Sequence, residues 1–332
     1  MKKILVLACA ALAAPFASAQ LINGAGSSFD NPAFTLWFDA YAKVDPGARF
    51  NYQSVGSGAG QKQLLAQTVD FGASDAPMTD EAMAPAPSRI LHIPVVAGAV
   101  VVSYNLPGSP ALKLDGDALA GIFLGTIAKW NDPKIAALNP GVSLPDFNIV
   151  VIHRSDGSGT SFIFTDYLSS VSPEWSKKVG KATSVNWPTG LGGKGNEGVA
   201  GQIKQLPGSI GYVELAYAEQ NKLAFATLKN AAGNFIKASP DAVSKAMATA
   251  TIPDDFRFSM VNAPGAEAYP ISGASWVLVY QKQTKPDTAK KLVAFLKWAV
   301  TEGQKLSPTL NYAPLPESVQ TRELQLLGTI TY

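Results

Sequence analysis

The 332-residue chain contains one cysteine, Cys9, and only two histidines. Cys9 lies in an N-terminal segment that we expect to be removed, so the mature chain would have neither a disulfide nor thiol chemistry. Protein zinc sites need several Cys or His ligands at set spacings, and the sequence has no H-E-x-x-H or C-x-x-C pattern. The sequence therefore predicts no metal site and no cofactor.

Charge is also scarce. Charged residues make up 16% of the chain, the formal net charge is +2, and no Lys/Arg run exceeds two residues. Nucleic-acid binding depends on many cationic contacts with phosphates, so this composition argues against it. Hydrophobic residues account for 47% of the chain, which indicates a globular protein with a large core.

No stretch after the N-terminus is apolar over the ~20 residues that a bilayer span needs. Residues 1–19 have the three parts of a secretory signal peptide: two lysines, the apolar run Ile4–Phe16, and the small residues Ala17-Ser18-Ala19. We expect cleavage after Ala19 and export to a bacterial periplasm. The run ending at Cys9 faintly resembles a lipoprotein cleavage box, but cleavage there would leave almost no apolar region. The remaining roughly 310 residues are enough for two domains.

A strand, a small polar turn and a helix follow one another in the middle of the chain. Ile149–Ile152 predicts a buried strand that leads into Arg154, and Phe162–Leu168 predicts a helix. The turn between them contains two hydroxyl residues, Ser158 and Thr160. Helix N-termini have free amides and a positive dipole end, so this turn could hold a compact oxyanion.

Asp156 is well placed to pair with Arg154 and to fix the orientation of its guanidinium. Gly-Ser-Gly-Thr after a strand is also ordinary capping chemistry, and alone it is weak support for a binding site. The support comes from repetition of the pattern in the first part of the chain.

Three turns nearer the N-terminus repeat the pattern. Gly24–Phe29 follows a short strand and precedes a helix that begins near Asn31. Ser57 follows the strand Phe50–Ser54, and Asp75 follows the strand Val69–Ser74. Alternating strands and helices predict a mostly parallel, doubly wound α/β sheet, in which ligands bind at the carboxyl ends of the strands. We therefore expect these turns to form one anion site.

The long apolar run Ile90–Tyr104, interrupted at Gly98, could carry the chain from one domain into another. A return crossing is expected at Ala268–Gly273, ahead of a strand over 275–280. Two crossings predict a discontinuous domain I, residues 20–97 plus 272–332, and an inserted domain II, residues 98–271. Helices are expected over Leu119–Trp130 and Thr288–Val300.

Catalytic chemistry is hard to assemble from this sequence. His92 lies in an apolar strand and is expected in the core, and strand alternation turns His153 away from the side to which Arg154 points. Neither Ser57 nor Ser158 lies in a G-x-S-x-G elbow. The glycine run over residues 190–196 lacks the spacing of a P-loop. Binding is favoured over catalysis.

Taken together, these motifs resemble the family of periplasmic phosphate-binding proteins that serve the Pst phosphate ABC transporter (the PstS family). The motifs that carry the resemblance are 24–29, 56–57, 69–77, 154–162, 191–196 and 210–214. The resemblance covers nearly the whole mature chain. It implies a type II periplasmic binding protein fold with two α/β domains and phosphate in the cleft between them. It also implies delivery to the permease subunits of the transporter, and we expect a monomer.

The resemblance implies phosphate-binding residues in both domains: Ser28, Phe29, Ser57 and Asp75 in the first, and Arg154, Ser158, Gly159 and Thr160 in the second. Two positions depart from the family, which often has threonine at Ser28 and proline at Asp30. We expect Asp30 to cap the following helix and to point outward.

Asp75 suggests how the site could select its ion. An ionised carboxylate only accepts hydrogen bonds, so it favours phosphate, which keeps a proton near neutral pH, over sulfate, which does not. Asp75 could instead be the N-cap of a helix that begins near Pro77.

Two further functions would use the same anion site. A secreted phosphatase would hold a phosphoester there, although it would also need a metal or a nucleophile, and the sequence shows neither. A binder of another tetrahedral oxyanion would also fit. Arsenate shares the protonation of phosphate, so Asp75 would not exclude it.

Overall fold

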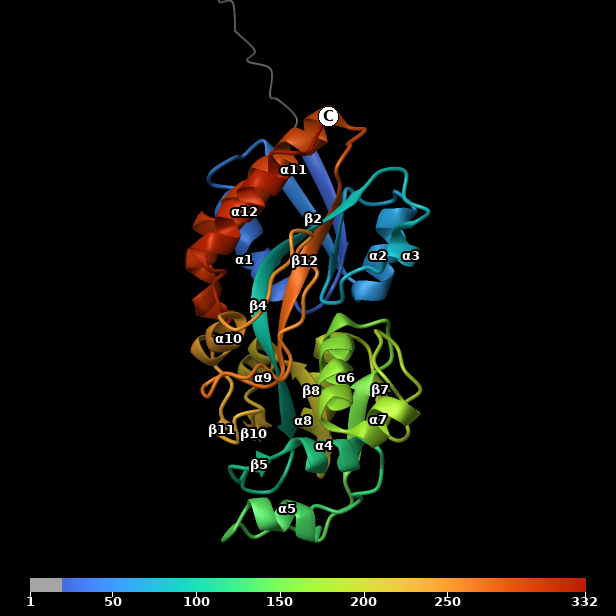
Figure 1. The fold of residues 1–332 in the computed structure, drawn as a ribbon, viewed down its shortest axis with the longest axis vertical. Coiled ribbons are helices and arrows are strands. Elements are labelled where there is room, and N and C mark those ends of the chain that lie inside the picture. Colours follow the sequence, from blue (N-terminus) through green and yellow to red (C-terminus); the bar gives the residue numbers. More distant parts are fainter. Residues whose placement is uncertain (1–19) are drawn as a thin grey trace, which may run out of the picture.

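One long strand, β4 (Ile90–Tyr104), connects the two halves of the molecule (Figure 1). The computed structural model describes residues 20–332, so the predicted signal peptide lies outside the described residues. Residues 90–99 of β4 pair antiparallel with β12 (Ser272–Tyr280), and residues 100–104 pair antiparallel with β8 (Ser209–Glu214). The chain therefore changes pairing partner in the middle of a continuous strand.

A parallel group of strands flanks this connection on each side. The strand order is β2-β1-β3-β12-β4-β8-β6-β7. In what we call the β1 half, β1 pairs in parallel with β2 and β3, and in the β6 half, β6 pairs in parallel with β7 and β8. The predicted parallel sheet is thus present as two parallel groups joined by antiparallel strands. The domain boundaries at 97/98 and 271/272 remain a prediction.

The other strands of the described chain are shorter than β4 and β12. They are β1 (Gln20–Gly26), β2 (Ala48–Ser54), β3 (Phe71–Ser74), β5 (Lys113–Leu114), β6 (Val150–Arg154), β7 (Leu191–Gly193), β9 (Ala224–Phe225), β10 (Thr227–Lys229) and β11 (Phe235–Ile236).

Helices cover both halves of the sheet (Figure 1). They are α1 (Asn31–Tyr41), α2 (Ser57–Leu65), α3 (Asp80–Met83), α4 (Gly116–Phe123), α5 (Pro133–Leu138), α6 (Gly159–Val171), α7 (Pro173–Lys178), α8 (Gly195–Gln205), α9 (Leu215–Asn221), α10 (Pro240–Met247), α11 (Pro286–Ala299), the 3₁₀ helix η1 (Glu302–Leu310) and α12 (Glu317–Leu327). Within residues 20–332, no helix combines the length and apolarity needed to cross a membrane.

Two expectations about these elements were wrong. Gly98 does not interrupt β4. The Phe29 ring packs closely against it, and a Cβ on Gly98 would lie 2.7 Å from Cζ of Phe29. The helix predicted over Leu119–Trp130 ends at Phe123, because Gly125 has a φ of +78°, a left-handed conformation that terminates helices. The predicted helix over Thr288–Val300 is present as α11.

Three aromatic residues of α1 belong to the core. Phe34, Trp37 and Tyr41 are buried, and Phe34 packs edge-on against Phe71 of β3 with ring centroids 5.9 Å apart. This packing fixes α1 on the β1 half. It thereby positions the turn between β1 and α1 that enters the candidate site.

Candidate functional site

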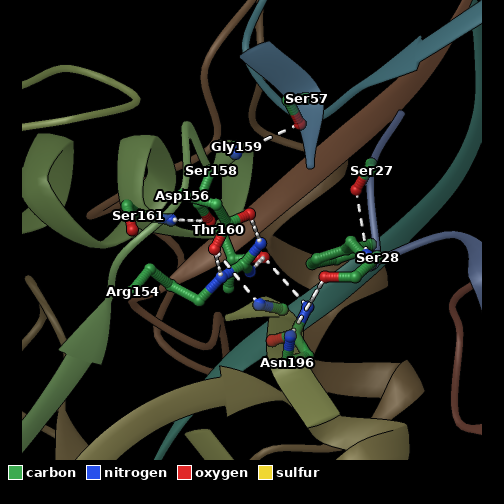
Figure 2. A network of polar contacts seen from close by, with 12 residues as sticks. Ser27, Ser28, Ser57, Arg154, Asp156, Ser158, Gly159, Thr160, Ser161 and Asn196 are labelled. Carbon is green, nitrogen blue, oxygen red and sulfur yellow. Dashed lines mark hydrogen bonds and ion pairs between the residues drawn. The ribbon is translucent and has the colours of Figure 1, made fainter. Parts of the chain in front are cut away.

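The candidate site lies where the parallel strands of both halves end. The turns after β1, β2 and β3 approach the turns after β6 and β7, and Figure 2 shows polar side chains from both sets pointing toward one another. The side chains gathered there are buried: Ser28, Ser57, Ser158, Thr160 and Asn196 are at most 1% exposed, and Arg154 is 3% exposed. The sequence predicts these turns at one site, and the structure brings them together.

Asp156 holds the Arg154 guanidinium in place. Nε of Arg154 donates to Oδ1 of Asp156 at 2.8 Å, and Nη2 donates to Oδ2 at 2.5 Å, so the pair is bidentate. Burial alone would lower the pKa of Arg154, but the hydrogen bonds and charge of Asp156 outweigh it and raise this pKa. Oδ1 of Asp156 also accepts from the Gly195 amide at 3.1 Å, which ties the arginine to the start of α8.

Ser57 connects the two halves of the molecule. Its hydroxyl oxygen accepts hydrogen bonds from the Gly159 amide at 3.1 Å and from the Asp75 amide at 3.2 Å. Beside it, the amide of Gly58 donates to the carbonyl of Gly157 at 2.9 Å. The N-termini of α2 and α6 therefore meet directly at the site.

Asn196 makes a second connection. Its backbone and side-chain nitrogens donate to the Ser28 hydroxyl at 3.1 and 2.9 Å, and Nδ2 also lies 3.2 Å from Oγ1 of Thr160 (Figure 2). Oδ1 of Asn196 accepts from the Glu214 amide at 3.0 Å, which fixes the orientation of the side chain. Asn196 thus links the turn after β1 to the start of α6.

Asp75 is the carboxylate that reaches these donors from β3. It is 1% exposed, its Oδ2 accepts from the Thr160 hydroxyl at 3.4 Å, and its Oδ1 accepts from the Ser275 hydroxyl at 2.8 Å. Burial raises the pKa of Asp75 to about 6, although the Ser27 and Ser275 hydroxyls and the Arg154 charge favour its ionised form. Asp75 does not cap α3, because the N-cap of that helix is Thr79, so the N-cap interpretation was wrong.

Two more residues expected at the site have defined positions. The Ser158 hydroxyl caps α6 by accepting from the Ser161 amide at 3.0 Å. The Phe29 amide donates to the Ser27 hydroxyl at 2.9 Å, while the Phe29 ring is fully buried in the core. The carbonyls of Ser28 and Phe29 accept hydrogen bonds from the hydroxyls of Tyr217 and Tyr312, both at 2.6 Å.

The sequence did not predict Asn196 and Ser275 as members of the site. Asn196 lies at the end of the glycine run 190–196, and its position directly after a strand is a local signal for a residue at this edge of the sheet. Ser275 lies within β12, where alternation predicts only which face it occupies. Ser275 is 0% exposed, and its hydroxyl is directed at two carboxyl groups.

The expected position of Asp30 was wrong. Asp30 occupies the N-cap position of α1 but makes no side-chain capping bond, and it is 0% exposed. Its Oδ2 lies 2.7 Å from the Ser275 hydroxyl oxygen. Proline in the first turn of α1 already favours the start of the helix, so the carboxyl is free to turn inward toward β12.

Both histidines lie where the sequence predicts. His92 is 3% exposed, and its Nε2 accepts from the Met78 amide at 3.0 Å. His153 is half-buried and stacks on Trp187 with ring centroids 4.9 Å apart, and alternation along β6 turns it away from the side of Arg154. Among residues 20–332, no group of three or more His, Cys, Asp and Glu side chains is arranged to hold a metal ion.

Known proteins match this chain over nearly its whole length. A family model described as "PBP superfamily domain" matches residues 13–302. The "Phosphate-binding protein PstS" of Pasteurella multocida is 48% identical over 305 residues, which covers 91% of this chain and 88% of that protein. Its namesake from Haemophilus influenzae is 47% identical over 309 residues, which covers 92% of each chain.

Solved structures have the same fold at low sequence identity. A phosphate-binding protein from Stenotrophomonas maltophilia superposes with a TM-score of 0.69 at 18% identity, covering 92% of this chain and 94% of that chain. An ABC-type phosphate transport receptor from Vibrio cholerae superposes with a TM-score of 0.58 at 19% identity, covering 89% of this chain and 100% of that chain. These likenesses support the fold, whereas the identities with the PstS proteins define the family. The chain belongs to the PstS family within the PBP superfamily.

Proposed function

We propose that this chain binds inorganic phosphate between its two halves, as an exported binding protein without catalytic activity. It would deliver the ion to the permease subunits of an ABC transporter and act as a monomer. The relatives' name, phosphate-binding protein, and the similarity to a phosphate transport receptor support this role. The residues proposed to bind phosphate are Ser28, Phe29, Ser57, Asp75, Arg154, Ser158, Gly159 and Thr160, with Asp156 orienting Arg154.

The observation that carries the proposal is that three buried serine hydroxyls accept hydrogen bonds from the protein but donate none to it. The Ser57 oxygen accepts from two amides and the Ser28 oxygen accepts from two nitrogens of Asn196. The Ser158 oxygen accepts from the Ser161 amide. In the described chain none of these three hydroxyls donates to a protein acceptor, so each keeps one hydrogen for a ligand. Three buried donors beside a fixed guanidinium suit a small anion rich in acceptors.

Asp75 would make the site selective for a protonated oxyanion. With a pKa of about 6, its carboxyl is mostly ionised at pH 7 and above, where it can only accept a hydrogen bond. Monohydrogen phosphate supplies that proton, whereas sulfate would place a second acceptor against it. Two buried acceptor oxygens that face each other without a hydrogen between them cost several kcal/mol. This cost corresponds to about 10³-fold or greater discrimination against sulfate.

Binding should be coupled to closure of the two halves. The donors come from both halves, so only a closed arrangement lets them reach one ion. Direct contacts between α2 and α6 at Ser57 and Gly159 support a closed form in which the ion would be enclosed. Small-angle scattering should show compaction on addition of phosphate, and an unchanged radius of gyration would contradict closure.

Calorimetric titration of residues 20–332 with phosphate, arsenate and sulfate tests the proposal. We expect tight, one-to-one binding of phosphate and arsenate and at least about 10³-fold weaker binding of sulfate. Equal binding of sulfate would contradict the role of Asp75, and no binding of phosphate would contradict the function. Incubation with a chromogenic phosphate ester should give no hydrolysis above background, whereas turnover would support a phosphatase.

A further inference from the structure

The Ser275 hydroxyl lies between two buried carboxyl groups. Its oxygen is 2.7 Å from Oδ2 of Asp30 and 2.8 Å from Oδ1 of Asp75. All three side chains are at most 1% exposed. Asp30 comes from the turn after β1, Asp75 from the turn after β3 and Ser275 from β12, so three elements converge on one hydroxyl.

Two short contacts to one hydroxyl group need two hydrogens, so one of these carboxyl groups must carry a proton. A serine hydroxyl has one hydrogen, so it can donate to only one of its two neighbours. Ionised carboxylates donate nothing, and two of them could not both be paired with this hydroxyl. The second short contact therefore needs a protonated carboxyl that donates to the serine oxygen.

The surroundings identify Asp30 as the residue that carries the proton. Oδ1 of Asp30 is buried without a hydrogen-bond partner, a costly position for a charge. The neighbouring groups that interact electrostatically with Asp30 are acids: Asp75 raises the pKa of Asp30, and Asp30 in turn raises the pKa values of Glu214, Tyr52 and Tyr312. Burial, and then the charge of Asp75, raises the pKa of Asp30 well above its ordinary value. Asp75, by contrast, has Arg154 and Thr160 to stabilise its charge.

We propose that Asp30 is a neutral carboxylic acid that positions Asp75 through Ser275. Asp30 donates to the Ser275 oxygen, and the Ser275 hydroxyl donates to Oδ1 of Asp75. This relay stabilises the ionised form of Asp75 and directs its other oxygen, Oδ2, toward Thr160 and the site. Asp30 is thereby a positioning residue for selection of protonated oxyanions, and the inference rests on the proposed phosphate function.

Two variants of similar shape separate the proton donor from the bulk of the side chain. Asp30→Asn keeps a donor toward Ser275, so phosphate affinity at pH 7 should stay within about threefold of the parent. Asp30→Leu has the same number of heavy atoms without a donor, and it should bind phosphate about tenfold more weakly and discriminate less against sulfate. Equal affinities for the two variants would overturn the proposal.

Ser275→Ala tests whether Asp30 acts through the hydroxyl. In that background, Asp30→Asn and Asp30→Leu should have the same phosphate affinity, because the relay is already broken. A persistent tenfold difference between them would overturn the relay. Glu323→Gln and Glu323→Leu form the control pair, since Glu323 is another buried carboxyl, on α12, and neither change should affect phosphate binding.

Infrared spectroscopy tests the protonation state without any ligand. The parent should show a carbonyl band of a protonated carboxylic acid that disappears in Asp30→Asn and shifts in Ser275→Ala. A spectrum in which Asp30→Asn removes no such band would overturn the proposal. If the parent binds no phosphate, the proposed function is wrong, but the infrared band still shows whether Asp30 is protonated. The band also answers that question if Asp30→Leu does not fold.

Discussion

The Ser28 hydroxyl accepts two hydrogen bonds from a single residue, Asn196, at 3.1 Å from its backbone nitrogen and 2.9 Å from its side-chain nitrogen. The two residues belong to opposite halves of the molecule and are 168 positions apart in the chain. Because both acceptor directions of the oxygen are used, the single Ser28 hydrogen has a defined direction. A donor that is oriented before the ligand arrives costs less to order when it binds.

Replacement of Asn196 by alanine should weaken both stability and binding. The Glu214 amide would lose its acceptor, the Asn196 Oδ1, and remain buried, which should lower the free energy of unfolding by about 1–3 kcal/mol. Phosphate affinity should fall about tenfold, because Ser28 and Thr160 lose the donors that orient them.

Asn105→Ala is the matched control for this change. The Asn105 amide donates to the carbonyls of Ile203 and Lys204, at the opposite end of α8 from Asn196. Denaturant titration should show a loss of stability of about 1 kcal/mol, and calorimetry should show unchanged phosphate affinity. Parent-like phosphate affinity in Asn196→Ala would contradict the orienting role.

Asp75→Asn should relax the exclusion of sulfate. The asparagine amide can donate to a fully deprotonated oxyanion, so sulfate no longer meets an unpaired acceptor. We expect sulfate affinity to rise by about 10²-fold or more, with a smaller loss of phosphate affinity. Asp70→Asn is the control, since Asp70 lies just before β3 and binds Lys285 and the Asn23 amide. Unchanged sulfate rejection by Asp75→Asn in calorimetry would remove Asp75 from this role.

The convergence of the turns was predictable, whereas the contacts between them were not. Strand ends with glycine and hydroxyl residues recur at Ser28, Ser57 and Ser158, and the carboxyl ends of parallel strands meet at one edge. The bidentate pair of Arg154 and Asp156 follows from a spacing of two residues. The contacts of Asn196 and Ser275 join segments far apart in the chain, and spacing along the sequence does not predict such contacts.

Asp30 shows how a correct local rule can give a wrong position. Aspartate before Asn-Pro is a favourable helix N-cap, and this rule predicts an outward carboxyl. In the fold the side chain instead forms its short contact with Ser275 on β12, which lies 245 positions further along the chain. The continuous strand β4 is similar: Gly98 locally predicts an interruption, but it accommodates the Phe29 ring.

His92 should make the protein less stable in acid. Burial, together with the nearby charge of Arg257, lowers the pKa of His92 to about 4 from an ordinary value of 6.5. Between these values the unfolded chain binds a proton that the folded chain does not, so stability falls as the pH falls from 6.5 to 4. The full loss is about 3 kcal/mol.

Denaturant titrations between about pH 4 and pH 7 measure this contribution. His92→Gln keeps an acceptor near the Met78 amide and cannot titrate. Its free energy of unfolding should therefore change less with pH than that of the parent, by a slope equivalent to at most one bound proton. His153→Gln is the control, because His153 is only half-buried and its replacement should change the pH dependence less. The same pH dependence in His92→Gln and in the parent would contradict the assignment.

Gly159→Ala should block closure of the two halves without harming the fold. A Cβ at this position would lie 2.5 Å from the Ser57 hydroxyl oxygen and 2.6 Å from Oδ2 of Asp75. Both distances are shorter than the van der Waals contacts found in folded proteins. Gly159 is the first residue of α6, where alanine is a good helix former, so the free energy of unfolding should change by less than about 1 kcal/mol. Phosphate affinity should fall roughly tenfold to hundredfold, since overpacking costs about 1–3 kcal/mol.

Gly201→Ala separates this steric effect from the general effect of alanine in a helix. An added Cβ at Gly201, in the middle of α8, meets no atom within 4 Å, so binding should stay as in the parent and stability should rise slightly. Scattering should show that phosphate compacts the parent and Gly201→Ala but compacts Gly159→Ala less. Parent-like affinity and compaction in Gly159→Ala would mean that the Ser57–Gly159 contact is not part of the bound form. Closure would then have to bring the donors together by another route, because Arg154 and Ser57 lie on opposite halves and a single ion must reach both.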